Sequence, residues 1–382
     1  MINRFLQAWT RPKAAEELDL HFDRPLVLFQ SDDWGRVGVR DRSGWEELQR
    51  AGLKLGEKPY DHCSLETADD LQALRDVLAR HRDSVGRHPC LKMNFIMANV
   101  DFPRCAEAGL REVPLRPLTD GLPDAWVRPG LMEAYQEGIQ ENLFRPGLHG
   151  LTHFCMGAVA RELERGEERS QVLHTLWRAC TPYIHWRMPW VGYEYWDPAL
   201  SSDRRFLPLA MQQTMISRAA EIYRGFFGSI PFSACAPGYR ANQATKSSWF
   251  QAGVRVVQGG PGERRGPCLD QNGMLLTFRN VEMEPATEAC ELGAIVEQAN
   301  DCLTRGLPAV VSIHSINFQS TLRDFRTTTL GMLDRFLGAL ERRWPELLYV
   351  HDENLWEIAT AGFFAGEAEN IKVSAAVPGK DG

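Results

Sequence analysis

The sequence predicts an α/β protein built around a parallel sheet, either closed as a barrel or open as a doubly wound sheet. Apolar runs alternate with helix-patterned segments along most of the 382 residues, as repeated strand–helix units require. The apolar runs are continuous, which is typical of parallel strands covered on both faces. No glycine-rich nucleotide-binding motif follows the first run, which disfavours a nucleotide-binding sheet.

Eight of these runs are expected to form strands. They lie at 25–31, 90–99, 143–149, 231–237, 254–259, 274–283, 307–315 and 346–352. The segment between the first two has a threonine that can cap a helix, acidic residues in its first turn and basic residues in its last. Helices are expected at 67–82, 129–143, 158–180, part of 201–228, 245–253, 286–306 and 327–344.

The composition argues against several classes of partner. The net charge is −7, from 43 basic and 50 acidic residues, and no basic run stands out, so nucleic acid and anionic membranes are not expected partners. No apolar run is long enough for a signal peptide or a membrane span, which predicts a cytoplasmic protein. The nine scattered cysteines contain no C-x-x-C pair, and we expect them to be reduced.

Polar residues gather where the predicted strands end. Active sites of barrels are built from the loops at the carboxyl ends of their strands, so these residues are candidates for chemistry. They are Asp32 and Asp33 after the first strand, His149 and His153 after the third, Tyr239 and Arg240 after the fourth, His314 after the seventh and Asp352 after the eighth.

Each candidate has a functional and a structural interpretation. His149 and His153 could chelate a metal from one helical face, or be unrelated histidines. Asp32 and Asp33 could divide the work of metal ligand and base, or cap a helix with an acidic first turn. Arg240 could hold a carboxylate or lie on the surface, and His314 could be catalytic or a hydrogen-bonded structural residue.

The segment 183–198 is unusually rich in aromatic residues. Trp190 and Trp196, with their aromatic neighbours, could form a stacking wall for sugar rings. They could equally form the core of an inserted subdomain, because most aromatic residues are buried.

Taken together and in order, these motifs resemble the polysaccharide deacetylases, the carbohydrate esterase family four type. SDDWG at 31–35 resembles the Asp-Asp motif, HGLTH at 149–153 resembles H-[ST]-x-x-H, and VVSIHS at 310–315 resembles the strand that ends in histidine. The stretch 236–257 matches the third motif loosely, with its arginine after the Pro-Gly and not before it. The resemblance spans about residues 25–350 and implies a distorted (β/α)7-type barrel.

The resemblance also implies a role for each residue. Asp32 would be the general base and His314 the general acid, while Arg240 would tether Asp32. Asp33, His149 and His153 would bind a divalent metal, in the first place zinc. The acidic partner of His314 is left open among Glu282, Glu284 and Asp352. Contacts with substrate are expected from Trp34, Tyr239, Trp190 and Trp196.

These expectations define one function and two alternatives. The chain is expected to be a metal-dependent hydrolase that uses a metal-activated water to remove an acyl group, in the first place N-acetyl, from an amino sugar or glycan precursor. The alternatives are a glycosidase with paired carboxylates on a related barrel, and an inactive barrel that binds glycans. Residues 1–364 are expected to form one domain, with an aromatic-rich insertion at about 155–228, and 365–382 a flexible tail.

Overall fold

The computed structural model describes residues 18–262, 265–363 and 370–376, and its centre is a curled ten-stranded sheet. Parallel strands make up most of the sheet, and antiparallel pairing joins only its last two neighbours, β9 and β10. The path of neighbours is β11 (Val281–Glu282), β12 (Ala309–His314), β2 (Leu26–Trp34), β3 (Leu91–Ile96), β6 (Phe144–Gly150), β7 (Ser233–Cys235), β8 (Val256–Pro261), β10 (Leu275–Arg279) and β9 (Cys268–Leu269), and β13 (Leu348–Tyr349) pairs with β2.

One segment of chain joins the two ends of this sheet. β10 pairs with β8 while β11, one residue further on, pairs with β12. The residue between them, Asn280, is fixed to β12, because its backbone N–H donates to the Val310 carbonyl at 3.2 Å and its side chain accepts from the Val310 N–H at 2.8 Å. The sheet is therefore a distorted (β/α)7-type barrel, and the doubly wound alternative is wrong.

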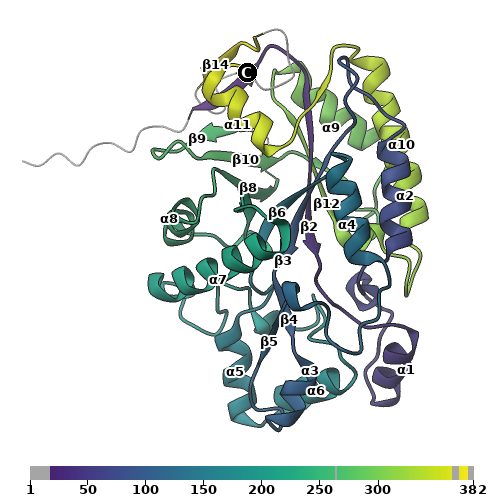
Figure 1. The fold of residues 1–382 in the computed structure, drawn as a ribbon, viewed down its shortest axis with the longest axis vertical. Helices are drawn as coiled ribbons and strands as arrows, with labels where there is room; N and C mark the ends of the chain where they lie inside the picture. Colours follow the sequence, from purple (N-terminus) through teal and green to yellow (C-terminus); the bar gives the residue numbers. More distant parts are fainter. Residues whose placement is uncertain (1–17, 263–264, 364–369, 377–382) are drawn as a thin grey trace, which may run out of the picture.

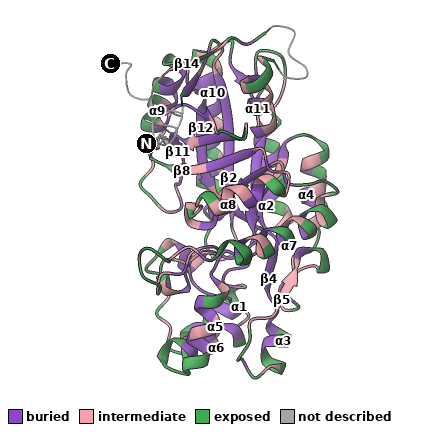
Figure 2. Ribbon diagram, turned by 90° about the vertical axis from the view of Figure 1, so that its left-hand side faces the viewer, coloured by how far each residue is buried: buried purple, intermediate pink, exposed green. Residues whose placement is uncertain are grey.

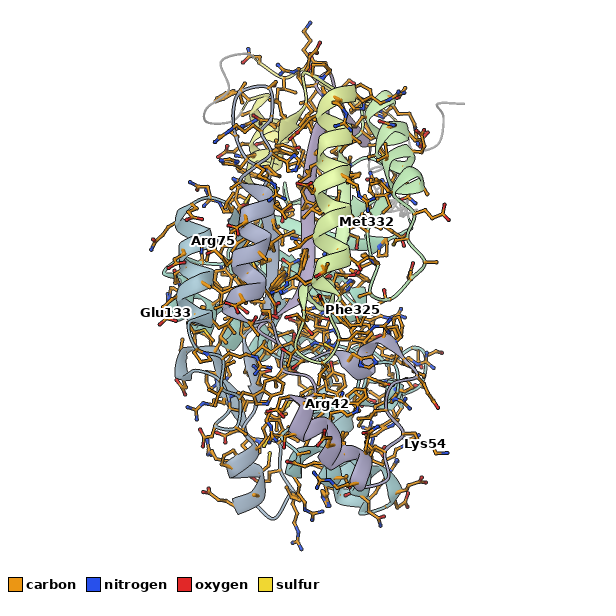
Figure 3. The ribbon with its side chains drawn as sticks, turned by 90° about the vertical axis from the view of Figure 1, so that its right-hand side faces the viewer. Arg42, Lys54, Arg75, Glu133, Phe325 and Met332 are labelled. Atoms are coloured by element: carbon orange, nitrogen blue, oxygen red, sulfur yellow. The ribbon has the colours of Figure 1, made fainter. Side chains whose placement is uncertain are left out.

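Helices surround the barrel, and a smaller cap lies beyond the carboxyl ends of its strands (Figure 1). Figure 3 shows α10 and α2 side by side on one flank, with Met332 and Arg75 labelled. The barrel helices are α2 (Ala68–Leu78), α4 (Leu131–Gln140), α7 (Leu209–Phe227), α8 (Gln243–Gln251), α9 (Leu292–Thr304), α10 (Arg326–Arg343) and α11 (Asp352–Ala361). The cap holds α1 (Arg42–Arg50), α3 (Phe102–Glu107), α5 (Met156–Arg165), α6 (Glu168–Arg178) and the antiparallel pair β4 (Ala98–Val100) and β5 (Leu115–Pro117).

All eight predicted strands are present, and most helices lie where the sequence predicts them. The helix expected at 158–180 is two helices, because Gly166 ends α5 in the left-handed region at φ 67°. Within the segment expected to be a flexible tail, β14 (Val373–Ala376) pairs antiparallel with β1 (Asp19–Phe22), and the rest of the segment lies largely outside the described residues. The described cysteines form no disulfide, and no helix in the described ranges is long and apolar enough to cross a membrane.

The inside of the barrel changes from apolar to polar along β2, and Figure 2 shows that the strands of the barrel are largely buried. Leu26 and Leu28 of β2 belong to a buried apolar cluster with residues of β8, β10 and β12. Gln30 and Asp32 follow at alternate positions on the same face, as the two-residue period of a strand requires. Buried polar groups therefore meet at the carboxyl end of the barrel.

Candidate active site

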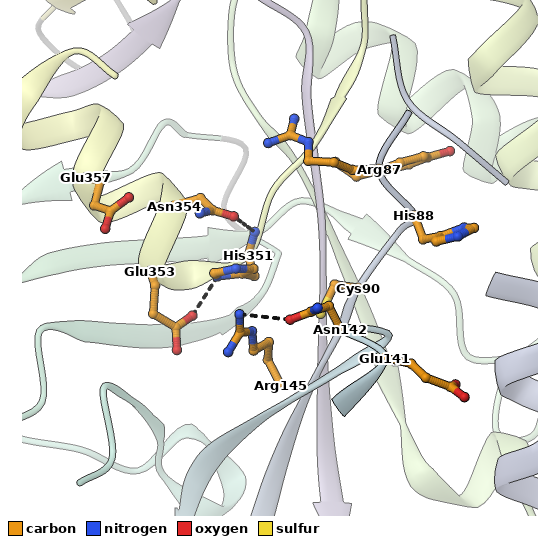
Figure 4. Close-up of a pocket in the computed structure, with 11 residues that line it drawn as sticks. Arg87, His88, Cys90, Glu141, Asn142, Arg145, His351, Glu353, Asn354 and Glu357 are labelled. Atoms are coloured by element: carbon orange, nitrogen blue, oxygen red, sulfur yellow. Dashed lines mark hydrogen bonds and ion pairs between the residues drawn. The ribbon is translucent and has the colours of Figure 1, made fainter. Parts of the chain in front are cut away.

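The predicted residues meet in a cleft of about 220 Å³ at the carboxyl ends of the strands. Asp32, Asp33, His149, His153 and His314 all line it. A larger cavity of about 580 Å³ lies at the amino ends of β3 and β6, where Figure 4 shows a different set of side chains. None of the predicted catalytic, metal-binding or substrate-contacting residues lines that larger cavity, so the smaller cleft is the candidate active site.

Asp33 and the two histidines form a compact group of possible metal ligands. Asp33 Oδ1 lies 3.5 Å from His149 Nε2 and 3.2 Å from His153 Nε2, and all three side chains are buried. This oxygen accepts no hydrogen bond among the described residues, although buried polar atoms are rarely left unpaired. One carboxylate oxygen and two imidazole nitrogens are a donor set that suits zinc and related divalent ions, so these residues fit a metal.

The other ring nitrogen of each histidine is held from outside the group. His149 Nδ1 lies 3.0 Å from the carbonyl oxygen of Cys235, which can only accept, so Nδ1 donates there and Nε2 is the nitrogen near Asp33. His153 Nδ1 lies 2.6 Å from the hydroxyl of Tyr183. Burial holds the pKa of His153 well below its usual value, which keeps its ring in the neutral form that metals bind.

A local distortion of β2 brings the neighbouring carboxylates into one cleft. In a regular strand Asp32 and Asp33 would point to opposite faces. Here the β2–β3 register shifts between Ser31 and Trp34, and Asp33 has a left-handed φ of 72°. Burial alone would raise the pKa of Asp33, but the charge of Arg36, 3.0 Å from Oδ2, holds it well below its usual value.

The loop that carries the two histidines has a support of its own. Gly150 has a φ of 119°, and a Cβ built there would lie 1.9 Å from Oε2 of the buried Glu194. Glu194 Oε1 accepts from the backbone N–H of Leu151 at 2.9 Å, and burial raises the pKa of Glu194 to about 8. Glycine at 150 therefore makes room for a carboxyl group that braces the loop.

Arg279, which the sequence analysis did not single out, holds Asp32. Its Nη1 lies 2.7 Å from Oδ2 and its Nη2 lies 2.7 Å from Oδ1, while Asn94 Nδ2 donates to Oδ1 at 2.7 Å. Burial would raise the pKa of Asp32, but Arg279 lowers it below its usual range, so the carboxylate stays ionised. The prediction that Arg240 is this tether is wrong, because Arg240 is exposed and its guanidinium lies over the Trp196 ring at 5.2 Å.

His314 is paired with Glu284, one of the three acids left open by the sequence. His314 Nδ1 lies 2.6 Å from Glu284 Oε1, and Asn317 fixes the other carboxylate oxygen at 2.7 Å. Burial lowers the pKa of His314, but Glu284 outweighs it and raises the pKa to about 9. His314 Nε2 lies 3.9 Å from Asp32 Oδ2, so a charged imidazole stands beside the base.

The two other acids are placed differently. Glu282 lines the cleft, and no contact of its carboxylate with His314 is found. Asp352 lies inside the barrel, where it accepts from Gln30 at 2.8 Å and from Gln258 at 2.6 Å.

Of the four residues expected to contact substrate, the structure places only Tyr239 in the cleft. Trp34 is fully buried and stacks on Phe318 with 5.7 Å between ring centroids, so its predicted substrate contact is wrong. Trp190 lies beside a separate cavity, under the guanidinium of Arg169. Trp196 packs behind Tyr193 and does not line the cleft.

The aromatic segment 183–198 combines both interpretations that the sequence left open. Tyr183 and Tyr195 are buried, as expected of a core. His185, Trp186 and Tyr193 line the cleft, as expected of a wall. Trp186 is the most exposed of these three, at 45%, and its ring centroid lies 4.8 Å from that of Tyr60.

No protein-family model and no curated protein sequence matches the chain. The fold is similar to several solved structures, among them those of polysaccharide deacetylases, the family that the sequence motifs resemble. A proposed polysaccharide deacetylase from Mycobacterium smegmatis has 11% identity and a TM-score of 0.46, with 91% of each chain covered. A family 4 carbohydrate esterase from Streptomyces lividans in complex with acetate has 12% identity and a TM-score of 0.36, over 86% of this chain and 93% of the other.

A family 4 acetyl xylan esterase from Clostridium thermocellum in complex with a cobalt ion has 8% identity and a TM-score of 0.37, over 87% of this chain and 91% of the other. These likenesses are too distant to bear on activity, which must be argued from the site itself.

Proposed function

We propose that the protein is a metal-dependent hydrolase that removes an acyl group, in the first place N-acetyl, from an amino sugar or glycan precursor. The observation that carries the proposal is the unpartnered Asp33 Oδ1 between two histidine Nε2 atoms, beside an ionised carboxylate and a charged imidazole. This arrangement supplies a place for a cation, a base and an acid within one cleft. A cytoplasmic location, as the sequence predicts, is part of the proposal.

Asp33, His149 and His153 would hold the divalent ion, in the first place zinc. Such an ion polarises an acyl carbonyl and lowers the pKa of water from about 15.7 toward 7. Asp32, fixed by Arg279, accepts the proton of the attacking water. The low pKa of Asp32 keeps it ionised and makes it a weak base, so it would take a proton from water only where a bound ion had made that water more acidic.

His314 acts on the leaving group. Its ring is protonated at neutral pH because Glu284 raises its pKa to about 9. It can therefore give a proton to the departing amine or hydroxyl, and Glu284 keeps the ring oriented while the charge is lost. Aromatic side chains on the cleft wall, Tyr60, Trp186 and Tyr193, offer faces on which a sugar ring can stack.

The glycosidase alternative is less compatible with the geometry. A glycosidase needs one carboxylate free to attack or to activate water and a second that is protonated. In this cleft the protonated group beside Asp32 is the imidazole of His314, whose Nε2 lies 3.9 Å from Asp32 Oδ2, and not a carboxylic acid.

The first experiment measures metal content by mass spectrometry on protein purified without a metal-binding tag. Wild type is compared with the His149→Ala, His153→Ala double variant, and Trp190→Ala serves as a control outside the cleft. We expect about one divalent ion per chain, lost only in the double variant, together with release of acetate from acetylated amino sugars. Glycosidic cleavage that resists chelators would contradict the proposal and support the glycosidase.

A further inference from the structure

The cleft is lined by aromatic rings and by carboxylates. Tyr60, His185 and Trp186 are among the aromatic side chains, and Glu282 and Glu288 are among the acids. Among the described residues that line the cleft, none is a lysine or an arginine. The mouth of the cleft therefore carries negative charge from acids, Glu282 and Glu288, that have no part in the proposed catalytic steps.

Each of the three deeper acids has a cationic partner. Asp32 pairs with Arg279, Asp33 with Arg36, and Glu284 with the charged His314. For Glu282 and Glu288 no ion pair or side-chain hydrogen bond is found among the described residues, and Glu288 is exposed. Burial and the charges of Glu288 and Glu284 raise the pKa of Glu282, which shows that these carboxylates lie close enough to repel one another. Within the part of the chain that the structure describes, no cation therefore pairs with the two carboxylates at the mouth.

A second observation points to a ligand in the same cleft. Asp33 is 3% exposed, and its Oδ1 faces the cleft without a hydrogen-bond partner. The base of the cleft therefore has a polar atom, Asp33 Oδ1, that a bound ligand can pair with. The acid pair at the mouth affects which ligands reach that base.

We propose that the substrate carries a protonated amine next to the acyl group that is removed, and that Glu282 and Glu288 bind this ammonium together with the aromatic side chains of the cleft. The inference rests on the proposed deacylase function and names its substrate class, an acylated amino sugar that has a second, free amine. An ammonium can interact with both kinds of side chain, because carboxylates pair with it and the faces of Tyr and Trp rings attract cations. A phosphorylated or carboxylated sugar would meet like charge at the mouth and is disfavoured.

Trp186 is placed to present a ring face at the mouth. It is 45% exposed, its ring packs on Tyr60, and its backbone has a left-handed φ of 64°. Its carbonyl oxygen accepts from Lys58 Nζ at 3.1 Å, which anchors the residue.

The test is isothermal titration with two disaccharide probes, the fully deacetylated chitosan disaccharide and N,N′-diacetylchitobiose. The proteins are wild type, Glu282→Gln, Glu288→Gln, the double variant and Glu133→Gln, which removes an exposed carboxylate on α4 (Figure 3). We expect wild type to bind the amine-bearing sugar at least about fivefold more tightly, and 0.5 M salt to weaken this preference. The double variant should lose it, each single variant should reduce it, and Glu133→Gln should keep it.

Equal binding of the two sugars, no binding of either, or a preference that survives the double variant would overturn the inference. Acetate release from N,N′-diacetylchitobiose, measured on the same wild-type sample, separates this inference from the proposed function. Turnover without an amine preference contradicts only the inference. An amine preference without turnover of any acetylated sugar contradicts only the proposed function.

Discussion

Arg279 holds both carboxylate oxygens of Asp32 through two charge-assisted contacts of 2.7 Å, inside a barrel where both side chains are buried. Replacing Arg279 with Gln leaves a buried carboxylate without its counter-charge. We expect the free energy of unfolding to fall by about 3–5 kcal/mol, since breaking a buried ion pair strands one charge. We also expect kcat/KM for acetylated sugars to fall about 100-fold or more, because the base is no longer ionised and oriented.

Arg240→Gln is the matched control for this experiment. Arg240 is exposed and touches the Trp196 ring, so its loss should change stability by less than about 1 kcal/mol. Urea unfolding and acetate release, measured on both variants, check the assignment. A large loss of stability and activity with Arg240→Gln, and none with Arg279→Gln, would show that Arg240 holds Asp32 as the sequence analysis expected.

A divalent metal should stabilise the folded protein through Asp33, His149 and His153. An ion that binds only the folded state raises the melting temperature as its concentration increases. Here it would also give the unpaired Asp33 Oδ1 a partner. We expect chelator-treated wild type to gain melting temperature when zinc or cobalt is added, and the His149→Ala, His153→Ala variant to gain none. Differential scanning calorimetry reads this effect without any substrate. An equal gain in both proteins would place the ion elsewhere.

Much of this site could be predicted because its motifs are local. Asp32 and Asp33, His149 and His153, and His314 each lie at or just beyond the end of a strand whose apolar run can be recognised in the sequence. Parallel strands bring their carboxyl ends to one face of a barrel, so locating the strands also brings these residues together.

The remaining residues depend on relationships that no short stretch contains. Asp32 and Arg279 are 247 positions apart, and nothing in the run MLLTFRNVEM marks its arginine as pointing into the barrel. Trp34 is buried because the register of β2 shifts just before it, which a regular strand pattern does not indicate. The sequence could not show whether Glu282 or Glu284 is the partner of His314. The pairing of β11 with β12 decides this, because it sets which carboxylate faces His314.

Glu284 should control the alkaline limit of activity. His314 acts as an acid only while protonated, and Glu284 raises its pKa from 6.5 to about 9. Wild-type activity should therefore decline as the pH rises through about 9, and in Glu284→Gln the decline should move toward 6.5. The pH profile of kcat/KM measures the shift. Glu282→Gln is the control, because its carboxylate makes no contact with His314 and should leave the alkaline limit in place.

Glu194 should make stability fall as the pH rises, since burial raises the pKa of its carboxyl from 4.5 to about 8. An acid with a raised pKa in the folded state contributes its full stability below the unfolded pKa, and this contribution is lost as the pH rises toward the folded value. Between pH 5 and 8 we expect wild type to lose about 1 kcal/mol per pH unit relative to Glu194→Gln, whose amide does not ionise. Urea unfolding at several pH values measures the difference. The exposed Glu133→Gln should follow the wild-type slope, and a Glu194→Gln variant that does so too would show that Glu194 ionises normally in the folded protein.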